Sequence, residues 1–233
     1  MPASEKSAAG STILPPTSKH CQDGVVSSNL NNVKMTKKSR PYHHGNLRTA
    51  LIAAAEAVIT ERGVDGFSLR EAARRAGVSP AAPGHHFGDA RGLLTAVATA
   101  AFTELGDVLA AAAAVPGDRR PRLEAQGAAY VGFALAHPAA FDLMWRRAVV
   151  DAADPDFVAA GRRAFEMLDA VVRADQPPIA DPLDPALAPT VAAWSLVHGF
   201  AKLAVEDVFG GDPGTRQRAA AALLPAVLAS LDI

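Results

Sequence analysis

Apolar side chains return at helical spacing through most of the chain after residue 40, and no stretch of useful length alternates apolar and polar residues. The clearest pattern runs over Asn46–Arg62 and is followed by the helix-stopping Gly63. A second pattern begins at Asp89, a helix-capping residue, and continues to about Val115. These periodicities predict an all-α protein with one long helix near its middle.

Between these two helices, the stretch Phe67–Phe87 predicts two short helices joined by a tight turn. Ser68 and Glu71 have the S-x-x-E spacing of a capping box, in which each residue satisfies a free amide of the other. A glycine then stops the first helix, and Ser79 followed by a proline marks the start of the second. We therefore expect a helix-turn-helix whose second helix is Ser79–Phe87.

The rest of the chain is alanine-rich and punctuated by proline. The expected helices are Pro121–Ala136, Pro138–Val150, Pro155–Ala174, Pro185–Phe209 and Pro213–Leu231, with a proline-rich loop over Gln176–Pro189. Pro189 and Pro225 fall inside helical patterns and are expected to kink or shorten their helices. The total is about nine helices.

Charge is distributed unevenly along the chain, although the net charge is only −1. Residues 34–92 carry ten Lys/Arg against five Asp/Glu, whereas residues 93–233 carry eleven against seventeen. A basic head on an acidic body indicates a polyanionic partner for the head, and random surface charge is the alternative. The 233 residues, 49% of them hydrophobic, suffice for one or two domains with a sizeable core.

Other classes of protein are disfavoured. Cys21 is the only cysteine, which excludes an internal disulfide and a cysteine-based zinc site. No apolar run approaches the roughly 20 residues that span a membrane, and no secretion signal is visible, so we expect a cytoplasmic protein. The pairs His43–His44 and His85–His86 lack metal-ligand spacing, and no catalytic motif appears. We expect no metal, no cofactor and no enzymatic activity.

The helix-turn-helix region resembles the TetR family of bacterial transcriptional regulators. The residues that carry the resemblance are His43–Arg48 (HHGNLR), Gly63, Phe67, Leu69, Ala73, Gly77–Ser79, His86–Phe87, Asp89 and Leu93–Leu94. A weaker likeness, Trp194–Gly199, resembles the Trp…His-Gly signature of one subgroup's regulatory domain. The chain departs from the family at Gly84, where an aromatic residue, often tyrosine, is usual.

The resemblance implies an N-terminal three-helix helix-turn-helix domain followed by a helical-bundle regulatory domain. We place the DNA-binding domain at residues 41–90 and the ligand-binding and dimerisation domain at residues 91–233. Residues 1–40 are expected to be a disordered tail, because they are rich in Ser, Pro, Ala, Gly and Asn. Met35 looks like the start of an ordinary family member, so residues 1–34 are either a genuine tail or a misassigned start.

The second helix of the motif is expected to lie in the major groove of DNA. Small side chains at its start can meet thymine methyl groups, a histidine can reach a base edge, and the preceding basic arm can follow phosphates. The expected DNA-binding residues are Lys37, Lys38, Arg40, Thr49, Arg70, Ser79, Ala81, Ala82, His85 and His86. His86 resembles the family's phosphate-contacting histidine. The alternatives are a solvated arm and ordinary surface histidines.

Aromatic and sulfur-containing residues of the later helices form the candidate ligand site. They are Tyr130, Phe133, Phe141, Met144, Trp145, Phe165, Trp194 and His198. Trp194 and His198 are four residues apart and share a helix face. Such a lining suits a mostly apolar small molecule fixed by one or two hydrogen bonds, and Lys202 is the only obvious cation near it on the expected helix Pro185–Phe209. The alternative is an ordinary core with a satisfied histidine.

We therefore expect a ligand-responsive, DNA-binding transcriptional regulator, a repressor released by a small apolar inducer. A homodimer through the last two helices would place two recognition helices on a pseudo-palindromic double-stranded DNA operator. Its expected interface residues are Leu196, Leu203, Leu224 and Leu228. The alternative function is a small-molecule-binding or protein-interaction module that has lost DNA binding, which Gly84 keeps open. No membrane partner is expected.

Overall fold

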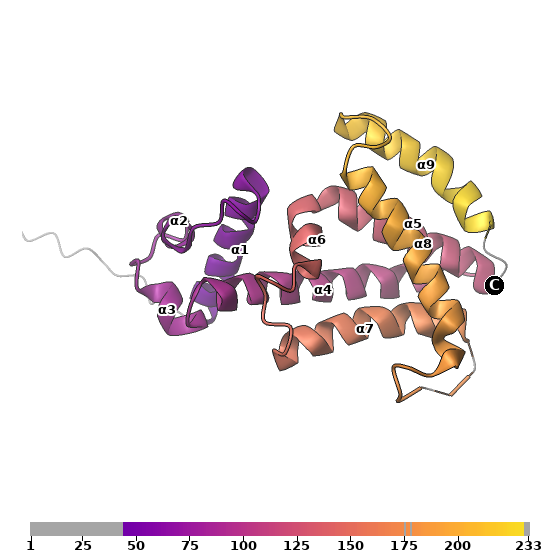
Figure 1. Cartoon of the computed structure of the whole chain (residues 1–233), viewed down its shortest axis with the longest axis horizontal. Coiled ribbons are helices and arrows are strands. Elements are labelled where there is room, and N and C mark those ends of the chain that lie inside the picture. Colours follow the sequence, from indigo (N-terminus) through magenta and orange to yellow (C-terminus); the bar gives the residue numbers. More distant parts are fainter. Residues whose placement is uncertain (1–43, 175, 178, 231–233) are drawn as a thin grey trace, which may run out of the picture. The chain divides into compact units, whose positions relative to one another are not determined.

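The computed structural model describes residues 44–174, 176–177 and 179–230, and every long element among them is a helix (Figure 1). In chain order these are α1 (His44–Arg62), α2 (Leu69–Arg75), α3 (Ala82–Phe87), α4 (Ala90–Ala113), α5 (Arg119–Ala136), α6 (Pro138–Trp145), α7 (Pro155–Val172), α8 (Ala188–Val205) and α9 (Pro213–Ala229). One turn of 3-10 helix, η1 (Pro185–Leu187), precedes α8. The all-α prediction is confirmed. The predicted tail, with Lys37, Lys38 and Arg40, lies outside the described residues.

An aspartate followed by a proline starts three of these elements. Asp154 at α7 and Asp212 at α9 each accept a hydrogen bond of 2.9 Å from the backbone amide three residues on, and Asp184 caps η1 in a similar way. The proline that follows takes the first helical position, where a missing amide proton removes no hydrogen bond. This two-residue signal fixes each start locally.

The two prolines that fall inside helical patterns differ in their effect. The helix predicted from Pro185 is shortened to one that begins at Ala188. Pro189 does not interrupt a helix, because α8 begins at Ala188 and Pro189 therefore sits in its first turn. Pro225 does lie inside α9, yet the helix continues past it to Ala229. The predicted loop before α8 consequently ends earlier than expected, at the turn of η1.

The turn between α2 and α3 also differs from its prediction. Gly77 has a φ of +70°, the left-handed conformation that glycine adopts without strain. Helix α3 then begins at Ala82, so Ser79 does not cap it with its side chain; instead the Ser79 carbonyl accepts the Ala82 amide at 3.0 Å. Pro83 thus occupies the first turn of α3, where it deletes no helical hydrogen bond, and it is buried.

The joint between α3 and α4 depends on a close backbone approach. Asp89 caps α4 by accepting the Gly92 amide at 2.9 Å. A Cβ atom at Gly92 would lie only 1.9 Å from the Phe87 carbonyl oxygen, so no residue with a side chain fits there without moving the backbone. The position of α3 on α4 is therefore set partly by this glycine.

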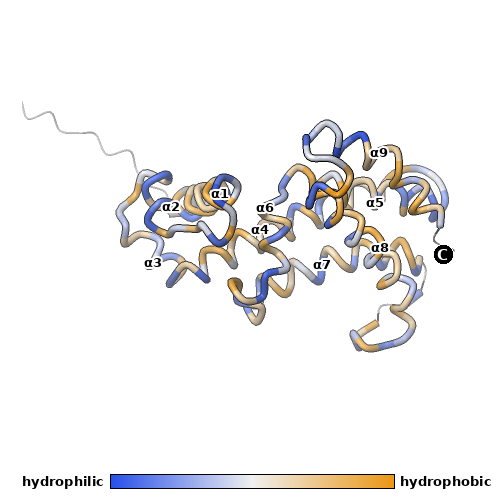
Figure 2. Tube along the Cα trace, turned by 45° about the horizontal axis from the view of Figure 1, so that its top comes forward, coloured by the Kyte–Doolittle hydropathy of each residue, from blue (hydrophilic) through white to orange (hydrophobic). Residues whose placement is uncertain are grey.

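Helix α4 is central to the described part of the chain. It packs against α1, α5, α6 and α7, with Leu93, Val97 and Leu105 among its buried residues. Figure 2 shows hydrophobic residues recurring along α4 and along the helices beside it. By length and composition α4 could cross a membrane, but 61% of its most apolar window is buried inside the protein, as in a core helix. The head α1–α3 is thus continuous with the larger helical body through α4.

Candidate functional site

The first candidate surface consists of α2, α3 and the turn between them. The exposed members of the predicted DNA-binding set are Thr49, Arg70, Ser79, Ala81 and His85, and Ala82 and His86 are half-buried. None of these described residues belongs to the core. The structure therefore leaves all seven side chains accessible to a partner.

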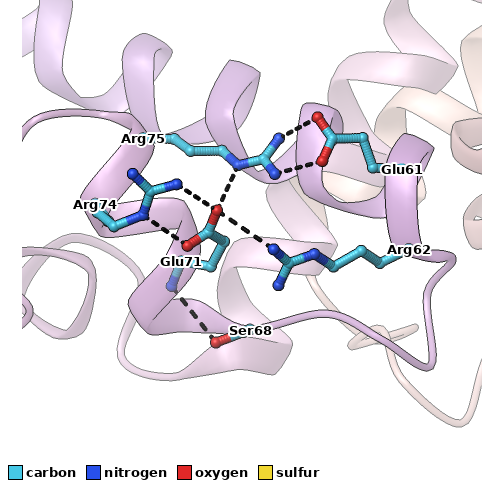
Figure 3. Close-up of polar contacts among 6 residues, drawn as sticks. All are labelled: Glu61, Arg62, Ser68, Glu71, Arg74 and Arg75. Carbon is cyan, nitrogen blue, oxygen red and sulfur yellow. Dashed lines mark hydrogen bonds and ion pairs between the residues drawn. The ribbon is translucent and has the colours of Figure 1, made fainter.

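Glu71 gathers arginines at the junction of α1 and α2 (Figure 3). It accepts two hydrogen bonds from Arg74, at 2.7 and 2.8 Å, and one from Arg75 at 2.9 Å. The Arg62 guanidinium lies 3.6 Å away, and Arg75 also bonds Glu61 in bidentate fashion. The hydrogen bonds from Arg74 and then Arg75 hold the pKa of Glu71 down to about 2. These arginines are thus paired with carboxylates of the same protein.

Only half of the predicted capping box forms. The Ser68 hydroxyl oxygen accepts the Glu71 amide at 3.4 Å, as predicted (Figure 3). The Glu71 carboxylate contacts the arginines instead of returning to the Ser68 amide. Arg70 is exposed and has no ion-pair partner among the described residues, so its charge remains available. The cationic character of this surface depends more on Arg70 than on the arginines around Glu71.

Helix α3 is joined to α1 by a cation–π contact. The guanidinium carbon of Arg48 lies 4.7 Å from the centre of the Phe87 ring. On the exposed face of α3, a Cβ atom at Gly84 would meet nothing within 4 Å. A side chain could therefore start from this position without meeting a neighbour at its Cβ atom.

The second candidate site is a cavity of about 300 Å³ lined by α4, α5, α6, α7, α8 and α9. Of the predicted ligand-site residues, Tyr130, Met144, Trp145, Phe165 and Trp194 line it. Phe133, Phe141 and His198 lie outside its lining, and the two phenylalanines are buried in the core. The unpredicted lining residues include Phe102, Leu105, Leu109, Gln126, Gly127, Phe157, Ala164, Leu168 and Leu228. Most of these could have been found from the apolar faces of α4 and α7.

His198 supports the cavity wall through Tyr130. The Tyr130 hydroxyl lies 2.9 Å from Nδ1 of His198. Burial, and then the positive charge of Lys202, lower the pKa of His198, which favours a neutral ring that can accept at Nδ1. Burial raises the pKa of Tyr130, while a weaker contact with the Trp194 indole opposes that rise. The polar groups of Tyr130 and His198, two residues of the predicted ligand site, are thus hydrogen-bonded to each other.

The end of α6 connects the cavity to the head. Trp145 lines the cavity, and the next residue, Arg146, forms an ion pair of 2.7 Å with Asp65 in the turn between α1 and α2. The loop after α6 is held on α4, because Arg91 donates to the Val150 carbonyl at 2.9 Å. Trp145 in the cavity wall is therefore connected to the head through one peptide bond and the ion pair of Arg146 with Asp65.

A second link passes through His137 at the turn between α5 and α6. Its ring nitrogens lie 3.6 Å from Glu56 of α1 and 3.4 Å from Glu104 of α4. The residues that the structure describes hold no cluster of three or more His, Cys, Asp or Glu placed to bind a metal ion. This trio is best described as a contact between head and body.

The exposed faces of α8 and α9 carry apolar residues. Val191 and Leu203 on α8 and Leu223 on α9 are each 44–45% exposed. Of the predicted interface residues, Leu224 and Leu228 are instead buried within the protomer, where Leu228 packs against Gly127 of α5. A Cβ atom at Gly199, between the two exposed α8 residues, would meet nothing within 4 Å.

Comparison with known families matches both halves of this structure. Residues 51–97 match the family described as bacterial regulatory proteins, tetR family, and residues 123–227 match the family described as tetracyclin repressor-like, C-terminal domain. The chain belongs to the TetR family of transcriptional regulators. A comparison with curated proteins gives no match.

Solved structures share the fold of this chain. A protein of unknown function from Rhodococcus sp. RHA1 is 34% identical, with a TM-score of 0.66, and the match covers 83% of this chain and 100% of that one. The TetR family regulator PfmR from Thermus thermophilus is 20% identical, with a TM-score of 0.58, over 78% of this chain and 99% of that one. A TetR family regulator from Marinobacter aquaeolei VT8 is 21% identical, with a TM-score of 0.55, over 78% and 95%. The last two likenesses show the shared fold.

Proposed function

We propose that this TetR family protein is a ligand-responsive repressor that a small, mostly apolar inducer releases from DNA. The observation that carries the proposal is the adjacency of Trp145 and Arg146. One side chain lines a cavity of about 300 Å³, and the other forms an ion pair with Asp65 of the helix-turn-helix head. A ligand that displaces Trp145 acts directly on a contact that holds the head.

The DNA-binding surface in this proposal is α3 together with the start of α2. Ala81, Ala82 and His85 face the bases, while Arg70, Ser79, Thr49 and His86 contact the backbone, with Lys37, Lys38 and Arg40 supplying a basic arm. Arg70 is exposed without a carboxylate partner among the described residues, which supports its role at a phosphate. The protein then acts in the cytoplasm, where bacterial DNA is located.

The repressor is proposed to act as a homodimer through α8 and α9. The exposed apolar residues Val191, Leu203 and Leu223 support this choice, because a second copy would remove them from water. The two-fold axis would place two α3 helices about 34–36 Å apart, on successive major grooves of a pseudo-palindrome. Leu203 remains an interface residue, and Leu224 and Leu228 are no longer assigned to it.

Release follows from linkage between the two sites. In the proposed dimer, one arrangement of the two heads fits DNA and another does not. An inducer that binds more tightly to the second arrangement must weaken operator binding. The operator must then weaken inducer binding by the same factor. In this chain the bistable element would be the end of α6, with its contacts to Asp65 and to α4.

The test is selection of duplex DNA from a random pool with the full chain, followed by anisotropy titrations at several salt concentrations. We expect retained sequences with two half-sites and an affinity that falls steeply with salt. Inducers are then sought in a panel of neutral apolar molecules, first by thermal shift of the free protein and then by release of the selected DNA. Failure to retain any duplex at low salt would contradict the DNA-binding part of the proposal.

Gly84 favours a second candidate, a small-molecule-binding or protein-interaction module that has lost DNA binding. The position is exposed and open, and it lacks the aromatic side chain that is usual in the family. The variant Gly84→Tyr separates the two candidates. If the wild type binds no duplex and the variant does, the second candidate is correct; if both bind, with the variant tighter, the repressor proposal stands.

A further inference from the structure

Gln126 is a buried polar residue in a mainly aliphatic and aromatic cavity lining. Its side chain is 1% exposed, and its amide nitrogen donates to the Met167 carbonyl at 2.8 Å and to the Leu109 carbonyl at 3.3 Å. Both protons of the amide nitrogen are therefore used. The other amide atom, Oε1, has no hydrogen-bond partner in the described part of the chain.

The orientation of this amide is fixed by its neighbours. Exchanging the nitrogen and oxygen would place Oε1 against the Leu109 and Met167 carbonyl oxygens, which offer only acceptors, and would lose both hydrogen bonds. Oε1 of Gln126 is therefore the free atom, and it accepts only. Buried acceptors in native proteins are almost always bonded, so a partner for this one is expected.

Trp145 provides the complementary group in the same lining. Its ring packs edge-on against Phe102, with centroids 5.3 Å apart, and lies 5.6 Å from the Trp194 ring. The indole Nε1–H is buried and also lacks a hydrogen-bond partner among the described residues. An indole nitrogen donates only, so this atom requires an acceptor.

The remaining polar groups of the aromatic cluster are already engaged. The Tyr130 hydroxyl and His198 bond each other, so they present no unmet requirement to a ligand. At the edge of the lining, Arg120 pairs with Glu124 at 3.0 Å, and Arg147 and Arg162 are exposed to solvent. Oε1 of Gln126 and Nε1–H of Trp145 are thus the buried polar groups of the cavity lining that have no hydrogen-bond partner among the described residues.

We infer, on the basis of the function proposed above, that the cavity takes a neutral apolar ligand carrying both a hydrogen-bond donor for Gln126 and an acceptor for Trp145. A hydroxyl or an amide on an apolar body meets both requirements. An ionised carboxylate does not, because it has only acceptors and would face Gln126 Oε1 with like partial charge. The inducer class is therefore an alcohol, phenol or amide rather than a fatty acid or a pure hydrocarbon.

Three eight-carbon probes of similar size test this inference. 1-Octanol has a donor and an acceptor, 2-octanone has an acceptor alone, and octanoate is charged. The chain contains two tryptophans, and both line the cavity, so intrinsic fluorescence reports binding of these non-absorbing probes. We expect 1-octanol to bind roughly ten-fold more tightly than 2-octanone, as one hydrogen bond would give, and octanoate to bind more weakly than either.

Two variants test whether Oε1 of Gln126 and Nε1 of Trp145 are the atoms that bind the probes. Gln126→Met should remove the preference for 1-octanol over 2-octanone while leaving 2-octanone binding nearly unchanged. Trp145→Phe keeps an aromatic ring and removes the donor, so it should weaken 1-octanol and 2-octanone by the same factor, with Trp194 as the remaining reporter. If Gln126→Met does not fold, the inference is still tested by the preference of the wild type for 1-octanol over 2-octanone and by the affinities of Trp145→Phe for both probes.

The outcomes separate this inference from the proposed function. Equal binding of 1-octanol and 2-octanone by the wild type, or tighter binding of octanoate, would overturn the inferred ligand class while leaving the cavity as a ligand site. Equal binding would also mean that the hydroxyl of 1-octanol does not donate to Oε1 of Gln126. Absence of binding by all three probes would instead count against the cavity as an inducer site, and with it against the proposed release mechanism.

Discussion

The guanidinium of Arg146 lies 2.7 Å from the carboxylate of Asp65, and this ion pair joins the end of α6 to the turn between α1 and α2. The preceding residue, Trp145, lines the cavity. A side chain that lines the cavity and a side chain that contacts the head are thus neighbours in sequence. Movement of the α6 terminus by a ligand would alter both contacts at once.

The first prediction is that Arg146→Gln uncouples ligand from DNA. The variant should bind an inducer found in the screen with wild-type affinity, but that inducer should release operator several-fold less effectively, because couplings in such systems span roughly 5–150-fold. Stability should fall by about 0.2–1 kcal/mol, as for an exposed ion pair. Operator affinity is measured by anisotropy with and without the inducer.

Arg163→Gln is the matched control. Arg163 pairs with Asp107 at the same 2.7 Å, but it joins α7 to α4 and has no contact with the head. It should lose similar stability and keep full release by the inducer. If Arg146→Gln releases DNA as well as Arg163→Gln does, the ion pair carries no signal.

The starts of α7 and α9 were predictable because their signals are local. Asp154 and Asp212, each followed by proline, satisfy a free amide within the same turn, so nothing distant is needed to place the helix. The start of α3 was not predictable in this way. Pro80 and Pro83 both suit the first turn of a helix, and burial of Pro83 selects the later start.

The cavity was only partly predictable for a related reason. Aromatic residues such as Trp145 and Trp194 stand out in the sequence, and they do line it. Gln126 does not stand out, because its unpaired oxygen results from two carbonyls on other helices, those of Leu109 and Met167. The inward position of Leu228 likewise depends on how α9 packs against Gly127. Such long-range geometry leaves no pattern in the sequence.

A second prediction concerns the phosphate contact of Arg70. Each phosphate contact contributes a slope of about −0.9 to the dependence of log K on log salt. Arg70→Ala should therefore weaken operator binding and make the slope shallower by about 0.9 for each protomer, with an unchanged melting temperature. Arg122→Ala, an exposed arginine on α5, is the control and should alter neither quantity. An unchanged slope in Arg70→Ala would remove Arg70 from the interface.

The third prediction tests the proposed dimer at Gly199. A side chain there meets nothing within its own protomer, but it would lie between the two copies of α8. Gly199→Arg should thus yield folded monomers in sedimentation at micromolar concentration and greatly weaken operator binding. The isolated protomer should not lose stability, since arginine favours a helix by up to about 1 kcal/mol over glycine.

The control for this variant is Gly132→Arg on α5. Gly132 is also exposed, helical and free of neighbours within 4 Å, so the substitution adds the same charge and bulk elsewhere. It should remain dimeric and bind DNA. Dimers in both variants would show that this face of α8 is not the interface.

The last prediction is a pH dependence of stability that comes from His198. Burial, and then Lys202, lower the pKa of His198 below its ordinary value near 6.5, so the unfolded chain binds this proton more readily than the folded one. The stability present above about pH 6.5 is therefore lost as the pH falls through the folded-state pKa. Protonation also turns Nδ1 into a donor, so its hydrogen bond with Tyr130 reverses and the Tyr130 hydroxyl oxygen becomes the acceptor.

His198→Asn places a carbonyl oxygen near the position of Nδ1 and cannot take up a proton. Its melting temperature should fall less than that of the wild type between about pH 7.5 and pH 5.5, a range that brackets the ordinary histidine pKa, measured by calorimetry in matched buffers. His198→Gln, whose carbonyl extends further than Nδ1, should lose the Tyr130 contact and melt lower at every pH in that range. If the wild type and His198→Asn lose stability in parallel on acidification, folding does not change proton binding by His198, and the lowered pKa makes no contribution to stability in this range.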